Sequence, residues 1–291
     1  MTLGPLPHMK PQKIAGYRVS SLLDSAGPTR VPGDMLKGWT DGHDVPDWAS
    51  SYLDAGRMIM AYQSFLVQTD DGQNVLIDCA VGEDGIFEFR PDWHQKKSNW
   101  LAHLGQAGLT PDDIDIVFLT HLHFDHTGWL TRLDAGQWVP TFANSRIVTS
   151  QQELDFWRAN KDSIPMMGQS WTDSIAPVES QIEIVAPGDD IEGLIVVDLA
   201  GHSPGMIGLE VQVDGRAVAS FNADLMHHPL QMAHPDLATI FCSDADSAIA
   251  TRRAKLAQYA TEKTVMFCNH FPGASAGIPV ADGDGFRFEP I

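Results

Sequence analysis

Short apolar runs recur along the chain, and most of them end in a turn. Residues 114–119 have the length and composition of a buried strand. Residues 64–69 and 75–78 flank Asp-Asp-Gly, and residues 207–213 and 216–221 flank Asp-Gly, so each pair predicts a β-hairpin. Further strands are expected over residues 17–22, 194–199 and 264–267, and the third of these is expected to be the last buried strand of the chain, ending at His270.

Helical periodicity appears between these runs. Residues 100–105 suit a short amphipathic helix, and residues 244–259 suit a longer one. Ser150 followed three positions later by Glu153 is typical of a capping box and predicts that another helix starts there. Three basic residues of the longer helix are expected to form a solvated face: Arg252, Arg253 and Lys255. The two halves of the chain repeat this order, which is consistent with two sheets covered by helices.

Three stretches lack a clear period. Residues 1–13 predict a loose tail, and residues 1–291 as a whole are expected to form a single domain. Residues 24–60 predict a lid or an oligomer arm, or alternatively a loop that covers the core, so a homodimer is possible. Residues 161–180 are also irregular and predict either a pocket wall or a plain surface connection. The apolar residues proposed to line a lid are Trp39, Trp48, Met58, Met60, Met166, Met167 and Trp171.

Charge and cysteine content narrow the range of partners. With 38 acidic and 19 basic residues the formal net charge is -19, which disfavours binding to nucleic acid phosphates. Cys79, Cys242 and Cys268 form no CxxC pair, so a disulfide framework is not expected. We expect no signal peptide, membrane span or membrane partner, and a cytoplasmic location follows by default.

The clearest chemical motif follows the strand at residues 114–119. His121, His123, Asp125 and His126 lie within six residues at the point where the chain leaves this strand. Imidazole nitrogens and carboxylate oxygens are the ligands that zinc and similar divalent metals prefer. A solvated polar loop is the alternative, but this density of histidine favours a metal site.

The motif resembles the HxHxDH signature of the metallo-β-lactamase-fold hydrolases. Three downstream stretches resemble the other ligand motifs of that family: Gly201-His202-Ser203-Pro204-Gly205, Asn222-Ala223-Asp224-Leu225 and Asn269-His270-Phe271-Pro272. The resemblance covers the chain from about Tyr17 to Pro272 and implies an α/β fold, the αββα four-layer sandwich. Met206 and Ala223 depart from the His and Gly that many relatives carry, but neither position is a ligand.

The resemblance also implies a ligand set for two divalent metal ions, with Zn²⁺ favoured. One ion would be bound by His121, His123 and His202, the other by Asp125, His126 and His270, and Asp224 would bridge them. A hydroxide between the ions would attack a carbonyl or phosphoryl centre. Asp224 and Asp125 are therefore the catalytic candidates, Asp125 also as a proton acceptor.

Three other residues near these motifs have open roles. Asp78 ends the second arm of the first hairpin, and it could hold a ligand or simply cap a turn. His227 and His228 follow Asp224 and could line the pocket and move protons, although support of a ligand or a surface position is favoured.

The function that the resemblance implies is hydrolysis of a small neutral or apolar lactone or ester, as in the lactonase and methyl-parathion-hydrolase-like branch. A phosphotriesterase at the same site is the alternative. A β-lactamase is disfavoured because Asp224 occupies the bridging position. A redox protein with a flavodoxin domain is disfavoured because the chain ends at Ile291, and a member without metals because all seven ligands are present.

Overall fold

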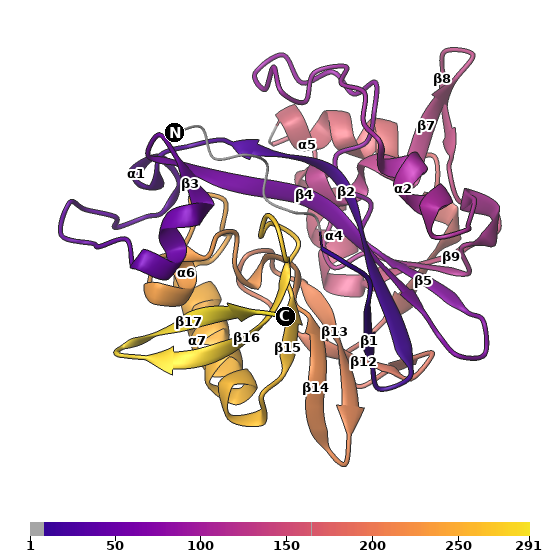
Figure 1. Ribbon diagram of the computed structural model, residues 1–291. Helices are drawn as coiled ribbons and strands as arrows, with labels where there is room; N and C mark the ends of the chain where they lie inside the picture. Colours follow the sequence, from indigo (N-terminus) through magenta and orange to yellow (C-terminus); the bar gives the residue numbers. More distant parts are fainter. Residues whose placement is uncertain (1–8, 164) are drawn as a thin grey trace. The chain divides into compact units, whose positions relative to one another are not determined.

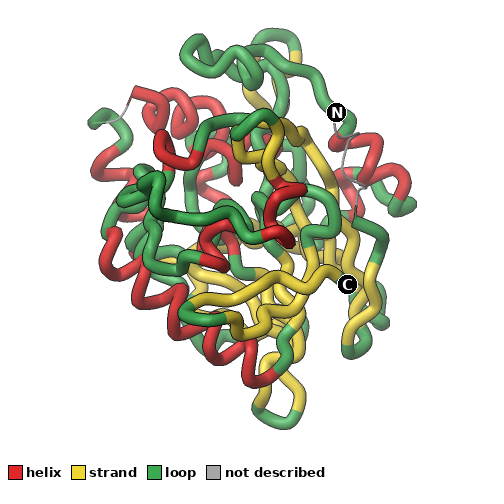
Figure 2. The backbone as a smooth tube through the Cα atoms, turned by 60° about the vertical axis from the view of Figure 1, so that its left-hand side comes forward, coloured by secondary structure: helices red, strands yellow, loops and turns green. Residues whose placement is uncertain are grey.

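The computed structural model describes residues 9–163 and 165–291, and these residues form two compact units. The described part of the first unit contains Met9, Lys10, Ala26–Ala61 and Pro187–Ile291. The second unit contains Pro11–Ser25 and Tyr62–Ala186. Figure 1 labels the helices and strands, and Figure 2 separates strands in yellow from helices in red.

The first sheet has the strand order β1-β2-β4-β5-β6-β9-β10, with β3 paired to β4. Its strands are β1 (Gln12–Ile14), β2 (Tyr17–Pro28), β3 (Leu53–Asp54), β4 (Arg57–Gln68), β5 (Asn74–Ile77), β6 (Ile116–Phe118), β9 (Arg146–Ser150) and β10 (Ile182–Val185). Strands β5, β6, β9 and β10 run parallel, so their carboxyl ends meet at one edge. Every residue of β6 is buried, as expected for a parallel strand covered on both faces.

The second sheet lies entirely within the first unit and has the order β11-β12-β13-β14-β15-β16-β17. Its strands are β11 (Asp190–Ile191), β12 (Leu194–Asp198), β13 (Ile207–Val213), β14 (Arg216–Phe221), β15 (Val265–Phe267), β16 (Ala276–Asp282) and β17 (Gly285–Pro290). Asp214 and Gly215, with φ values of 51° and 74°, form the predicted turn between β13 and β14.

Strand directions in the second sheet bring three chain segments to one edge. β12 and β14 are both antiparallel to β13, and β15 is parallel to β14. The three strands therefore point the same way, and the residues that follow them emerge from the same edge of the sheet. Phe221 pairs with Phe267, the last residues of β14 and β15. The motifs containing His202, Asp224 and His270 all begin at this edge.

Helices and short helical turns connect the strands. The α-helices are α1 (Pro32–Met35), α2 (Trp100–Gln106), α3 (Phe124–Thr127), α4 (Gln151–Asn160), α5 (Pro165–Ser170), α6 (Leu230–Ala233) and α7 (Ala245–Glu262). The shorter elements are η1 (Asp47–Tyr52), η2 (Pro111–Asp113), η3 (Gly128–Leu130), the π-helical η4 (Trp171–Ile175), η5 (Glu179–Gln181) and η6 (Ala223–Leu225), with a separate β7 (Thr131–Asp134) and β8 (Gln137–Pro140) hairpin. Helix α7 lies against β14 and β16, and α4 lies against β9. Each unit has its own apolar core.

The predicted hairpins, the strand before the metal motif and the helices at residues 100–105 and 244–259 are confirmed. The predicted last strand is β15, but β16 and β17 follow it and complete the sheet, so that prediction was wrong. Residues 161–180 are mostly helical rather than irregular. Gln12 and Lys13 of the predicted tail belong to β1, while residues 1–8 lie outside the described part of the chain.

The prediction that Arg252 lies on a solvated face was also wrong. Arg252 is fully buried, because its guanidinium group donates to the carbonyl oxygens of Leu225, Pro235 and Leu237. Of the proposed lid residues, Met167 and Trp171 belong to the core of the second unit. Met58 and Met60 are also buried, while the Met166 side chain lies outside the described residues. Whether residues 24–60 act as a lid or an oligomer arm stays a prediction. Within the described ranges, no helix is long and apolar enough to cross a membrane.

Candidate metal centre

In the second unit the ligand candidates follow the parallel strands β5 and β6. Asp78 comes directly after β5, and Thr120 and His121 come shortly after β6. The Asp78 carboxylate accepts hydrogen bonds from the Thr120 amide (2.9 Å) and the Thr120 hydroxyl (2.9 and 3.0 Å). The Nδ1 atom of His126 donates to the same carboxylate over 2.8 Å. Asp78 therefore fixes the imidazole of His126 with Nε2 on the opposite side of the ring.

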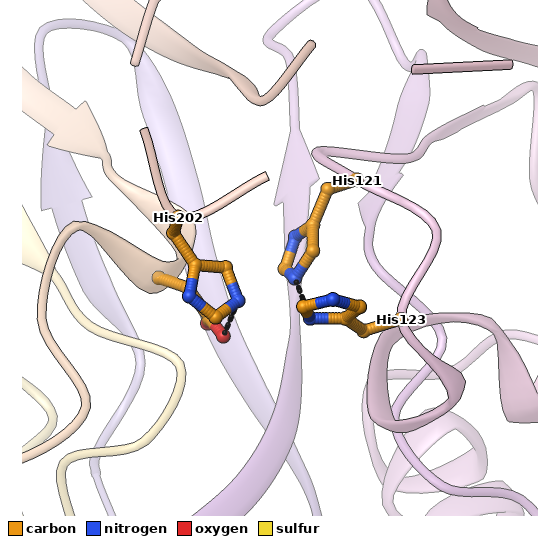
Figure 3. A group of neighbouring side chains, drawn as sticks. His121, His123 and His202 are labelled. Carbon is orange, nitrogen blue, oxygen red and sulfur yellow. Dashed lines mark hydrogen bonds and ion pairs between the residues drawn. The ribbon is translucent and has the colours of Figure 1, made fainter. Parts of the chain in front are cut away.

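His121 and His123 lie close together on the loop after β6. Nε2 of His121 is 3.1 Å from Nδ1 of His123, an interaction drawn as a dashed line in Figure 3. His121 and His126 are buried, whereas His123 and Asp125 are half-buried. Ligand atoms of Asp125 and His126 also lie within 4.8 Å of each other. The second unit thus brings together the four residues of the HxHxDH motif.

Only glycine fits at position 128, which follows the HxHxDH motif. A Cβ atom built on Gly128 would lie 1.9 Å from the carbonyl oxygen of Val81. The Gly128 amide donates to the Ala80 carbonyl over 2.8 Å, so the loop after β6 packs backbone to backbone on the segment after β5. Any side chain at this position would push the two loops apart.

In the first unit, three imidazoles surround the buried carboxylate of Asp224. His202 Nε2 and His227 Nε2 are each 3.1 Å from Oδ2, and His270 Nε2 is 3.0 Å from Oδ1. The carboxylate oxygen beside His202 is visible in Figure 3. All four side chains are buried. Ala223, just before Asp224, has a φ of 46°, a conformation that glycine adopts without strain.

The backbone of His202 is fixed by the start of α7. The His202 carbonyl accepts from the Ser243 amide over 2.8 Å, and the Gly201 carbonyl accepts from the Asp244 amide over 3.0 Å. Gly201 has a φ of 137°, and a Cβ there would lie 2.4 Å from the amide nitrogen of Ala248. The GHSPG turn is therefore pressed against α7, and only glycine fits at its first position.

His270 is anchored at both its backbone and its side chain. Its carbonyl accepts from the Ala61 amide over 3.0 Å, and its Nδ1 donates to the Ala61 carbonyl over 2.8 Å. This fixes the tautomer and directs Nε2 to Asp224, as in metal-ligating histidines. The other nitrogen of His202 lies 3.7 Å from the Cys242 thiol.

Burial and the Asp224 charge shift the pKa values of these groups in opposite directions. Burial lowers the pKa of His202, but the Asp224 carboxylate and Cys242 outweigh it and raise that pKa to about 9. For His227 burial dominates over Asp224 and lowers the pKa to about 3. Burial of the Cys242 thiol is outweighed by its hydrogen bond with His202, so the Cys242 pKa is lowered.

An aromatic pocket adjoins the HxHxDH loop within the second unit. Phe124, between His123 and Asp125, packs against Phe87 and Trp93, with ring centroids 5.8 and 5.0 Å away. The pocket is lined by apolar residues and by polar ones: Val81, Phe87, Phe124, Gly128, Trp138, Glu83, Gln169, Ser170, Asp173 and Ser174. Burial raises the pKa of Asp173. The lining carries carboxyl groups and no cationic side chain among these residues.

The structure also assigns surroundings to residues that sequence reasoning left open or missed. Asp78 contacts His126, as one of its two readings predicted. His227 contacts Asp224, and the sequence indicated this only through the spacing of three residues between them. His228 instead hydrogen-bonds the Tyr52 carbonyl and the Leu230 amide, away from the carboxylate. Glu153 and Cys242 were not predicted near ligands, because both contacts depend on distant parts of the chain.

The donor types of both units suit a zinc-like ion. Buried imidazole nitrogens with carboxylate oxygens are the set that borderline divalent metals bind, and several are oriented by a hydrogen bond to the opposite ring nitrogen.

Comparison with known proteins gives a family for this arrangement. The model of the metallo-beta-lactamase superfamily matches residues 60–218, more than half of the chain. The N-acyl homoserine lactonase AiiB of Agrobacterium fabrum is 30% identical over 129 residues, covering 40% of this chain and 42% of that protein. The match thus spans less than half the length of this relative.

Solved structures resemble the chain over nearly its whole length. The hydrolase AbOPH of the beta lactamase superfamily has a TM-score of 0.79 and 21% identity, with 100% of this chain and 99% of that chain covered. The dizinc quorum-quenching lactonase AidC has a TM-score of 0.79 and 22% identity, with 99% of both chains covered. A probable metal-dependent hydrolase from Staphylococcus aureus has a TM-score of 0.78 and 20% identity, with 94% and 96% covered. The predicted α/β metallo-β-lactamase fold is confirmed, and the chain belongs to the metallo-beta-lactamase superfamily.

Proposed function

We propose that this chain is a dinuclear metal-dependent hydrolase that opens a small neutral lactone or cleaves a related ester. The residues that would bind the metals are those of the HxHxDH loop together with three from the first unit: His121, His123, Asp125, His126, His202, Asp224 and His270. Two bound divalent ions, with Zn²⁺ favoured, would supply an activated water molecule and polarise the carbonyl group that is attacked.

One observation carries the proposal. A buried carboxylate with three imidazoles around it, at the carboxyl edge of a sheet, is costly to bury for stability alone. Asp78 and Ala61 orient two of the proposed ligands through their Nδ1 atoms, as supporting groups do in metal sites. The residues therefore offer oriented nitrogen and oxygen donors, which is what a hydrolytic metal centre needs.

The pocket beside Phe124 supports a neutral substrate. Glu83 and Asp173 in its lining and the net charge of -19 disfavour an anionic substrate. Phe87, Phe124 and Trp138 offer apolar surface to an acyl or aryl group. The relative AiiB is named as an N-acyl homoserine lactonase, so an acyl-homoserine lactone is the first substrate to test.

The test combines metal analysis with a substrate panel. Purified protein should contain close to two equivalents of metal, and pH-stat titration should record acid release from N-acyl homoserine lactones. A chelator should abolish this activity, and Zn²⁺ should restore it. Turnover of phosphotriesters but not of lactones or esters would favour the alternative function at the same site. Absence of bound metal, or unchanged turnover in His121→Ala and Asp224→Ala, would exclude the proposal.

A further inference from the structure

Helix α4 carries a buried carboxylate, Glu153, that contacts the HxHxDH loop after β6. Glu153 lies in the first turn of α4, and its amide donates to the N-cap hydroxyl of Ser150 over 3.1 Å. In a reciprocal capping box the glutamate side chain would return to the N-cap amide. Here Oε1 of Glu153 accepts from the amide of Leu122 over 3.0 Å, outside the helix.

The peptide that Glu153 holds lies between two proposed ligands. Leu122 separates His121 from His123, and its N–H belongs to the peptide that joins His121 to Leu122. Fixing this N–H restricts rotation on both sides of the peptide, because the peptide group is planar. The directions in which the two imidazoles leave the backbone depend on those rotations.

Trp157 connects the same carboxylate to the second imidazole. Its indole Nε1 donates to Oε1 of Glu153 over 2.6 Å. Its ring meets the His123 ring edge-on, with centroids 5.2 Å apart and planes at 66°. One turn of α4 thus contacts the loop at Leu122 and at His123.

Stability alone does not account for a carboxylate in this place. Glu153 is fully buried, and transferring a carboxylate into the protein interior is expensive even when it is hydrogen-bonded. A charged acceptor makes a hydrogen bond that is about twice as strong as the bond of a neutral acceptor. Here that bond ends on the peptide between two metal-ligand candidates.

We propose that Glu153 is a positioning residue, which fixes the His121–Leu122 peptide so that His121 and His123 are oriented for metal binding before a metal arrives. This inference rests on the proposed metal-dependent function. Glu153 is proposed to act through the Leu122 amide, whose hydrogen bond it accepts, and through Trp157, which packs against His123.

Metal affinity is the direct test. Dissociation constants for Zn²⁺ and Co²⁺ are measured by competition with a chromogenic chelator for wild type, Glu153→Gln and Glu153→Ala. Loss of a group that orients a ligand typically weakens metal binding about 10–100-fold, and this is expected for Glu153→Ala. Glu153→Gln keeps an oxygen acceptor for the Leu122 amide and should stay within a few-fold of wild type. Trp157→Phe keeps the ring beside His123 and should lie between the two.

A matched control separates orientation from general destabilisation. Glu210 is also buried, but its carboxylate accepts from Lys255, Tyr259 and Gln212, none of which adjoins a ligand candidate in sequence. Glu210→Ala should lower the free energy of unfolding without changing metal affinity. Hydrogen exchange of the Leu122 amide should accelerate in Glu153→Ala and not in Glu210→Ala.

The outcomes are distinguishable. If wild type binds metal and Glu153→Ala binds it equally well, or if Glu210→Ala weakens binding as much, the positioning role is wrong while the proposed function stands. If wild type binds neither Zn²⁺ nor Co²⁺, the proposed function fails. In that case unchanged exchange of the Leu122 amide in Glu153→Ala would also overturn the contact itself.

Discussion

The carboxylate of Asp78 accepts a hydrogen bond from Nδ1 of His126 over 2.8 Å, although the two residues are 48 positions apart. The same carboxylate holds the amide and hydroxyl of Thr120, the residue before His121. One buried side chain after β5 thus orients the loop after β6 at both ends of the HxHxDH motif. This follows from the parallel pairing of β5 with β6, in which Ile77 is opposite Phe118.

Removal of this carboxylate should weaken metal binding. Asp78→Ala leaves His126 free to rotate and leaves Thr120 without its acceptor, so we expect the metal dissociation constant to rise about 10–100-fold. Competition with a chromogenic chelator measures it. Asp115→Asn, at a carboxylate that accepts from the Asn74 amide, should leave the constant unchanged. An equal effect of both variants would contradict the orienting role of Asp78.

Gly128 should not tolerate a methyl group. Gly128→Ala places a carbon within 1.9 Å of the Val81 carbonyl oxygen, so the backbone must move, and we expect a loss of about 1–3 kcal/mol in unfolding free energy. Urea denaturation followed by circular dichroism gives the value. Gly105→Ala is the control: its Cβ would meet nothing within 4 Å in helix α2, and it should be neutral or stabilising. A Gly128→Ala protein as stable as wild type would show that the two loops do not pack as described.

Ala223→Gly should be tolerated and could stabilise the chain. Ala223 has a φ of 46°, a conformation in which an L-residue is strained by about 1–2 kcal/mol and glycine is not. Part of this gain is offset because glycine has a more flexible unfolded state. We therefore expect a change between zero and about +1 kcal/mol in urea denaturation. A clear loss of stability would mean that the methyl group of Ala223 contributes packing that outweighs the strain.

His228 should make the protein less stable in mild acid. Burial lowers its pKa from 6.5 to about 4, against the opposing effect of the Tyr52 carbonyl. Below pH 6.5 the unfolded chain binds a proton that the folded chain does not bind until about pH 4. The contribution is therefore complete above pH 6.5 and is lost as the pH falls to 4, a change of about 3 kcal/mol.

The measurement is the unfolding free energy of wild type and His228→Asn between pH 4 and pH 7. Asparagine keeps an acceptor for the Leu230 amide but does not titrate. The difference between the two proteins should shrink as the pH falls from 6.5 to 4. Two curves that stay parallel would show that His228 is not held neutral by burial.

Local sequence was enough to locate several of the strands, though not β16 and β17, and the candidate ligand motifs, because these depend on apolar runs and on residues that are adjacent in the chain. The hairpin of β13 and β14 and helix α7, predicted over residues 244–259, are examples. Each candidate ligand motif follows a strand within a few residues. The edge of the sheet at which the motif lies could therefore be inferred once the strand directions were known.

What could not be predicted depends on pairs of residues far apart in the sequence. Arg252 is a basic residue on a helix, and sequence alone therefore predicts that it is exposed. Its burial is favourable because its guanidinium group donates to carbonyl groups between residues 225 and 237. Glu153 has the spacing of a capping residue, but its carboxylate accepts a hydrogen bond from the amide of Leu122, which is 31 positions away. Residues 161–180 contain Pro165 and Gly168, which are poor helix formers, so the sequence did not predict the helical segment that begins at Pro165.

The pairing of Phe221 with Phe267 has a consequence for how this half of the centre could change over time. Asp224 and His270 each lie three residues after one member of this last pair of the β14–β15 ladder. Insertions or deletions in the connection between them, including helix α7 and the residues before it, would alter what surrounds Asp224 and His270 but not the separation of the two positions from which they start. The surroundings of this pair could therefore diverge while the spacing of the pair is inherited unchanged.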